Sequence, residues 1–151
     1  MNRTIGNPRL WERWKEAEQL ALVATFEDST TCTRVKEFCR DLMRDLGERC
    51  KVVQHVWVFS TFRMTELQEI AAEEAALADL VIIAARQAES LPEEVKSWIE
   101  RWLQQKGKRK ALLVALLDRA YDGAPNPIRA YLQEVANRGG FELLVDLGEG
   151  S

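Results

Sequence analysis

Five short apolar runs follow one another along this chain at nearly even intervals, and they constrain its fold more than any other feature. They cover residues 21–26, 52–59, 80–85, 111–117 and 141–145. Because these runs are short and largely uninterrupted by polar residues, they predict strands that are buried on both faces, as in a parallel sheet. Parallel strands need crossover connections, so we expect a sheet sandwiched between helices.

The segments between these runs carry helical patterns. Residues 31–46 place apolar side chains at the i, i+3, i+4 and i+7 positions, and Gly47 follows as a residue suited to ending a helix. Three further helix starts are marked by capping-type pairs: Thr65 with Gln68, Ser90 with Glu93, and Asn126 with Pro127. The sequence therefore predicts five strands and four crossover helices.

An extra segment precedes the first strand. Within residues 7–19, Asn7 can cap a helix, Pro8 can take its first position, and apolar residues form a narrow stripe. This pattern predicts a short amphipathic helix that covers part of the sheet or contacts a partner. We therefore divide the chain into an N-terminal extension with this helix (residues 1–19), one domain (residues 20–147) and a loose tail (residues 148–151).

The handedness of parallel crossovers leaves few topologies for five strands. The order 2-1-3-4-5 is the common one at this length, giving a three-layer α/β sandwich with helices on both faces. It places the second strand at an edge, which agrees with the polar residues Gln54 and His55 in that run. A ligand crevice is then expected outside the carboxyl ends of strands one and three.

Residues 78–83, followed by residues 91–99, resemble the third strand and the following helix of flavodoxins. The resemblance to the flavodoxin-like fold superfamily extends over about residues 20–145 and implies FMN as a ligand. The first loop offers hydroxyl groups for a phosphate, but it contains no glycine and begins with Glu27 and Asp28. We therefore expect no cofactor, with FMN as the alternative, in which case Tyr121 could stack on the flavin.

Phosphoacceptor receiver domains share this topology and provide a second comparison. Glu27 and Asp28 stand where receivers hold acidic metal ligands. However, the third run ends in Ala84, Ala85 and Arg86, where a receiver has its phosphorylated aspartate. A working receiver is therefore not expected.

The residues predicted to form the functional surface follow the carboxyl ends of strands one, three and four. They are Glu27, Asp28, Ser29, Thr31, Arg34, Arg86, Gln87, Ser90, Asp118 and Tyr121. The carboxylates of Glu27, Asp28 and Asp118 could converge on Mg²⁺, or they could simply cap a helix and begin a turn. We assign no metal ligand and no catalytic residue, because the one histidine, His55, lies within a strand and no nucleophile motif is present.

The amino-acid composition limits the kinds of binding partner that we expect. There are 21 basic and 24 acidic residues, giving a net charge of −3, so neither nucleic acid nor an anionic membrane is a favoured partner. The sequence begins without a signal-type apolar stretch, and we expect a cytoplasmic protein with reduced cysteines. The cationic residues 106–110 complement a helix C-terminus, with a phosphate-binding patch as the alternative.

These features favour a binding or regulatory module over an enzyme, with a second copy of the chain or another protein as its partner. The rival hypothesis is a flavin- or nucleotide-binding oxidoreductase or electron carrier that uses the same crevice.

Overall fold

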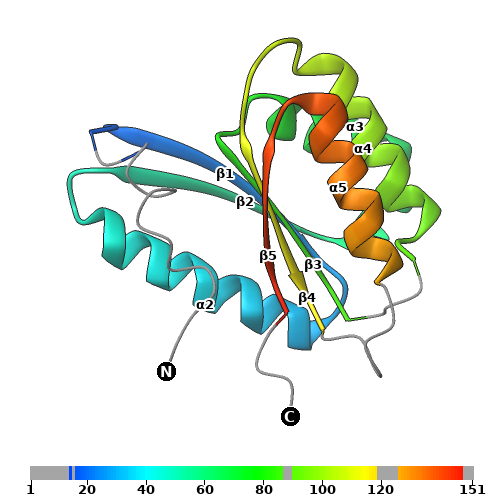
Figure 1. Cartoon of the computed structure of the whole chain (residues 1–151), viewed down its shortest axis with the longest axis horizontal. Helices are drawn as coiled ribbons and strands as arrows, with labels where there is room; N and C mark the ends of the chain where they lie inside the picture. Colours follow the sequence, from blue (N-terminus) through cyan, green and yellow to red (C-terminus); the bar gives the residue numbers. More distant parts are fainter. Residues whose placement is uncertain (1–13, 15, 87–89, 119–125, 148–151) are drawn as a thin grey trace.

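The computed structural model describes residues 14, 16–86, 90–118 and 126–147. Its centre is a sheet of five parallel strands in the order β2-β1-β3-β4-β5 (Figure 1). The elements in chain order are β1 (Gln19–Phe26), α2 (Ser29–Leu46), β2 (Lys51–Val58), the 3-10 helix η1 (Phe59–Arg63), α3 (Thr65–Ala76), β3 (Leu80–Ala85), α4 (Glu93–Gln105), β4 (Leu112–Leu117), α5 (Pro127–Gly139) and β5 (Glu142–Asp146). The predicted strand order is confirmed, with β2 at an edge.

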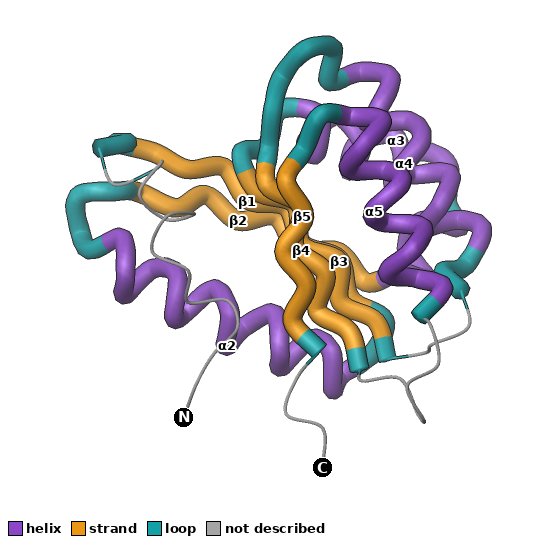
Figure 2. Tube along the Cα trace, viewed as in Figure 1, coloured by secondary structure: helices purple, strands orange, loops and turns teal. Residues whose placement is uncertain are grey.

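Helices cover both faces of the sheet, so the molecule is a three-layer α/β sandwich. In the described part of the chain, α2 lies on one face, and α3, α4 and α5 lie together on the other (Figure 2). Successive strand residues point to opposite faces: Ile82 belongs to the core beneath α2, and Val81 and Ile83 belong to the core beneath the three helices. All residues of β3 and β4 are buried, which explains why their sequences are apolar throughout.

A row of aromatic rings runs through the core on the three-helix side. The Trp57 and Phe62 ring centroids are 6.5 Å apart, and Phe62 stacks on Trp98 at 4.9 Å. Trp98 meets Trp102 edge-on at 5.9 Å, and Trp102 lies 5.4 Å from Phe141. The row connects β2, η1 and α4 to the start of β5, so these elements share one packed aromatic core.

Two of the predicted helix boundaries are confirmed by their capping contacts. Asn126 accepts hydrogen bonds from the N–H groups of Ile128 and Arg129, and Pro127 is the first residue of α5. Gly47 ends α2 with a φ of 80°, in the region that favours glycine. The helix α2 starts two residues earlier than predicted, at Ser29, because Asp28 caps it.

The other two predicted capping boxes are wrong. Met64 and Pro92 precede α3 and α4, and neither supplies a side-chain capping bond. Gln68 is buried and donates instead to the backbone oxygens of Phe62 and Glu94, at 3.0 and 3.3 Å. Its side-chain amide is a hydrogen-bond donor for carbonyl groups in η1 and α4. These contacts between elements use the Gln68 side chain in place of the predicted capping bond.

The predicted N-terminal helix is not seen in the part of the extension that the structure describes. Trp14 is buried in the core beneath α2, residues 16–18 form a turn and a bend without helix, and Gln19 already belongs to β1. The rest of the extension (residues 1–13 and 15) and the tail (residues 148–151) lie outside the described residues. None of the described helices combines the length and apolar character needed to cross a membrane.

Candidate functional site

Asp28 organises the loop that follows β1. Its Oδ1 accepts a hydrogen bond from the N–H of Thr31 at 3.0 Å, and the Thr31 hydroxyl oxygen accepts from the N–H groups of Glu27 and Asp28 at 2.9 Å each. This reciprocal capping box satisfies amide groups at the start of α2. Asp28 and Thr31, both expected at the site, therefore hold the helix N-terminus.

Arg86 joins the end of β3 to this loop. Its Nε donates to Oδ2 of Asp28 at 2.8 Å, and its backbone N–H donates to Oε1 of Glu27 at 2.9 Å. The hydrogen bond from the N–H of Thr31, supported by the Thr31 hydroxyl and the Arg86 guanidinium, lowers the pKa of Asp28 below its ordinary value, although burial acts in the opposite direction. Glu27, Asp28 and Arg86 thus come together, as predicted, and form contacts with one another.

Arg34, on the second turn of α2, is the centre of a second group of contacts at this edge. Its two terminal nitrogens donate to the backbone oxygens of Leu117 and Asp146, both at 3.0 Å. The same nitrogens lie 3.9 Å from Oδ1 of Asp118 and 3.6 Å from Oδ1 of Asp146. The planar guanidinium therefore ties together the carboxyl ends of β4 and β5, a geometry that a lysine cannot reproduce.

Asp146 is a site residue that sequence reasoning missed. It is the last residue of β5, and its register partner in β4 is Leu116. The rule that selected Asp118, a carboxylate following an apolar strand, also applies to Asp146. The predicted surface took residues from the carboxyl ends of strands one, three and four only, whereas Asp146 ends the fifth strand.

Of the four remaining predicted residues, Ser29 and Ser90 belong to the part of the chain that the structure describes. Ser29 is the exposed first residue of α2, and its backbone oxygen accepts from the Thr33 hydroxyl. Ser90 is exposed. Gln87 and Tyr121 lie outside the described residues. Tyr121 as a flavin-stacking ring therefore stays a prediction.

The charge at this edge does not suit a phosphate. The carboxylates of Glu27, Asp28, Asp118 and Asp146 stand against the guanidinium groups of Arg34 and Arg86. The Asp28 carboxylate also occupies the N-terminus of α2, where a flavin phosphate would accept hydrogen bonds from backbone N–H groups. The first loop thus fits FMN poorly.

Of the described cysteine and histidine residues, which could take part in catalysis, Cys32 lies half-buried in the first turn of α2, and the others lie within a strand or are buried. His55 lies on the edge strand β2, with its Nδ1 3.3 Å from Oε2 of Glu74 on α3. Cys39 and Cys50 are buried. Within the described ranges, no three His, Cys, Asp or Glu side chains are grouped so as to hold a metal ion.

Comparisons with protein-family models, with curated proteins and with solved structures returned no match for this chain. The five-stranded parallel α/β sheet is consistent with a flavodoxin-like or Rossmann-type fold.

Proposed function

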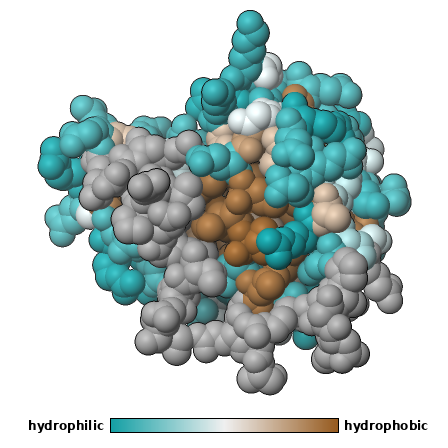
Figure 3. Space-filling model, viewed as in Figure 1, coloured by the Kyte–Doolittle hydropathy of each residue, from teal (hydrophilic) through white to brown (hydrophobic). Residues whose placement is uncertain are grey.

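We propose that this chain is a non-catalytic protein-interaction module that binds through the outer edge of β5, and that its partner is a second copy of itself. The observation that carries the proposal is the apolar character of this edge strand. Leu143, Leu144 and Val145 form its centre, and all three are only half-buried. Figure 3 shows a continuous apolar surface over β5, bordered above and on the right by hydrophilic residues.

The strand β5 also lies at an edge of the described sheet. Among the described strands it pairs with β4 alone, and its other edge has no strand beside it. An edge strand with exposed backbone groups and apolar side chains is a template for pairing with another strand. The binding mode that follows is addition of a partner strand to β5, with apolar side chains covered on both faces.

The opposite edge of the sheet lacks this character. Lys51, Gln54 and His55 of β2 are exposed and polar, as expected of an edge that resists pairing. Val56 is the exposed apolar residue of this strand, at 45% exposure. The contrast between the two edges favours β5 as the interaction strand.

The apolar centre of β5 suits a second copy, whereas its two acidic ends would bring like charges together and need a cation between them. In an antiparallel pair with a two-fold axis through Leu144, Glu142 of one copy faces Asp146 of the other. Arg34 lies 3.6 Å from the Asp146 carboxylate and would stand between the two acids at each end. The apolar centre would face itself, which makes the strand self-complementary.

The proposed role is non-catalytic because the arginines at the carboxyl edge of the sheet are engaged in contacts within the fold. Arg86 is bonded to Asp28 and Glu27, and Arg34 is bonded to two strand ends. These charged groups stabilise the loops and are engaged by one another. The arrangement therefore favours a binding module over the flavin- or nucleotide-binding alternative.

Light scattering over a wide range of protein concentration tests the proposal. We expect a mass twice the 17.3 kDa of the chain at high concentration, falling toward one chain on dilution. Leu144→Cys in a background with the three native cysteines replaced by serine should form an intermolecular disulfide on oxidation, because residue 144 of each copy faces its equivalent. Val56→Cys in the same background is the matched control and should stay monomeric.

A mass of 17.3 kDa at every concentration would contradict the proposal. Equal cross-linking of Leu144→Cys and Val56→Cys would do the same, since it would indicate random collision. A yellow preparation with bound flavin would instead favour the oxidoreductase alternative.

A further inference from the structure

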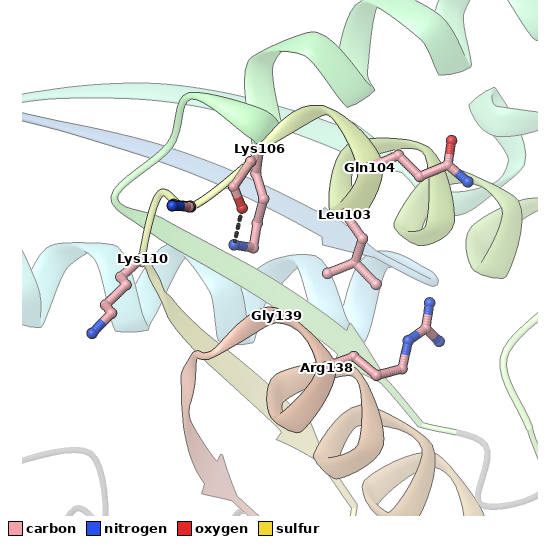
Figure 4. A pocket seen from close by; sticks show the side chains of 8 residues that line it. Leu103, Gln104, Lys106, Lys110, Arg138 and Gly139 are labelled. Atoms are coloured by element: carbon pink, nitrogen blue, oxygen red, sulfur yellow. Dashed lines mark hydrogen bonds between the residues drawn. The ribbon is translucent and has the colours of Figure 1, made fainter.

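A pocket of about 260 Å³ lies between the ends of α4 and α5, at the amino edge of the sheet (Figure 4). Its lining includes Leu103, Lys106, Lys108, Lys110, Arg138 and Gly139. No carboxylate of a described residue lines the pocket, and the turn of residues 106–110 contains four cations and one glycine. In a chain with a net charge of −3, this is a local concentration of positive charge.

Two of the four cations in the turn have structural roles. Lys106 Nζ donates to the backbone oxygens of Gly107 and Arg109, at 3.1 and 2.7 Å, and lies 4.8 Å from the centre of the Phe141 ring. Burial lowers the pKa of Lys106. Arg109 donates to the backbone oxygen of Leu77 at 2.8 Å and lies 3.5 Å from Asp79. These contacts account for both charges within the fold.

Arg138, on the α5 side of the pocket, is balanced as well. Its guanidinium donates to both carboxylate oxygens of Glu100, which raises the pKa of Arg138 and lowers that of Glu100. The pair contributes no net charge to the pocket.

Lys108 and Lys110 are the two cations that remain. Both are exposed, and neither makes a hydrogen bond or ion pair with any described residue. The helix-terminus explanation for this cationic run therefore accounts for Lys106, which is the C-cap residue of α4, but it does not account for Lys108 and Lys110. In Figure 4 Lys110 extends outward at the rim, so a ligand would draw its flexible side chain inward.

We propose that this pocket binds the phosphate group of a phosphorylated small molecule, with Lys108 and Lys110 as its charged ligands. A phosphate monoester carries about −1.5 to −2 charge at neutral pH, which matches two ammonium groups. Leu103 and Gly139 supply an apolar wall for the rest of the ligand. A volume of about 260 Å³ suits a small ligand and not a large cofactor.

Gly139 keeps the pocket wall closely packed. A Cβ atom there would lie 2.9 Å from the Phe141 ring and 3.0 Å from Leu103. Glycine allows α5 to approach α4 at this point, so the pocket depends on a specific contact between two helices.

Calorimetry and backbone NMR with inorganic phosphate and pyrophosphate test the proposal. At constant ionic strength, we expect saturable binding and shifts of the Gly107 and Gly139 amide signals. The double variant Lys108→Ala/Lys110→Ala should weaken binding by about tenfold or more, since hydrogen bonds to charged groups contribute substantially to affinity. The matched control, Lys36→Ala/Arg40→Ala, removes two exposed cations of α2 and should bind as the native protein does.

Three results would overturn the proposal. The first is no saturable binding of either anion, and the second is equal weakening in the two double variants. The third is binding that occurs only to phosphatidic acid vesicles or to a single-stranded oligonucleotide, which would assign the lysines to a membrane or to nucleic acid. The test is independent of self-association through β5, since the pocket and β5 are probed by different variants.

Discussion

Arg86 and Asp28 lie 58 residues apart in sequence and are joined by a hydrogen bond of 2.8 Å between Nε and Oδ2. The bond links the end of β3 to the start of α2. Because Asp28 also caps α2, one carboxylate holds both the N-terminus of this helix and the residue that follows β3. An ion pair therefore joins the carboxyl ends of β1 and β3, where topology predicted a ligand crevice.

Replacing Asp28 with alanine should lower the free energy of unfolding by about 1–2 kcal/mol, the usual cost of losing an N-cap. Urea denaturation measures this loss. Asp28→Asn is the matched variant: its amide oxygen still caps the helix, so it should be less destabilised. A loss as large in Asp28→Asn as in Asp28→Ala would show that the charge matters more than the cap.

The pH dependence of stability should change in the same variants. The pKa of Asp28 is lowered in the folded protein from an ordinary value of 3.8. Its contribution is therefore fully present above that value and is lost as the pH falls through the folded-state pKa. Asp28→Asn should show a shallower acid-induced loss of stability than the native chain. Parallel acid titrations for the two proteins would contradict this assignment.

Replacing Arg34 with alanine should destabilise the protein by about 1.5–3 kcal/mol, since hydrogen bonds to charged groups contribute this much. Its two terminal nitrogens donate to the backbone oxygens of Leu117 and Asp146, which would lose these hydrogen bonds. Arg34→Lys should restore only part of the stability, because an ammonium does not span two acceptors as the guanidinium does. The exposed Arg40→Ala on the same helix should change stability by less than about 0.5 kcal/mol.

Replacing Gln68 with methionine should cost about 1–3 kcal/mol, the penalty for leaving buried polar groups without partners. The backbone oxygens of Phe62 and Glu94 would lose their donor, and Arg101 would lose the Gln68 oxygen to which it donates. Chemical denaturation measures the effect. Exchange of Gln104, an exposed glutamine of α4, for methionine is the control and should be nearly neutral.

The three cysteines should react with a thiol reagent in a defined order. Burial raises the pKa of Cys39 to about 11 and also raises the pKa of Cys50, whereas Cys32 is only half-buried. Since the thiolate is the reactive form, one thiol should react rapidly in the folded protein at mildly alkaline pH, and the others only on unfolding. Cys32→Ser should remove the rapid phase, and its persistence in that variant would contradict the assignment.

The fold could be predicted from the sequence because the pattern of an apolar strand followed by an amphipathic helix recurs along the chain. The residues of β3 and β4 are apolar throughout, and buried parallel strands explain this pattern well. The polar side chains of Gln54 and His55 marked β2 as an edge in advance. Helix starts were harder: Asn126 and Asp28 cap as local rules predict, whereas Gln68 bonds to distant carbonyl groups that a local pattern cannot contain.

The candidate site was only partly predictable for a related reason. Topology correctly brought Glu27, Asp28 and Arg86 together, because parallel strands end at one edge. It did not predict that Arg86 would bond to both acids, or that Arg34 would bind the backbone of two strands. Such pairings depend on side-chain reach and on three-dimensional neighbours, which the spacing of residues along the chain does not specify.

The row of rings from Trp57 to Phe141 gives the molecule an intrinsic optical reporter. Electronic transitions of indole rings held this close and at fixed angles couple to one another, so Trp98 and Trp102 should dominate the near-ultraviolet circular dichroism. That signal depends on side-chain order and not on helix content. Loosening of the α4 layer would therefore be visible by spectroscopy before the backbone unfolds.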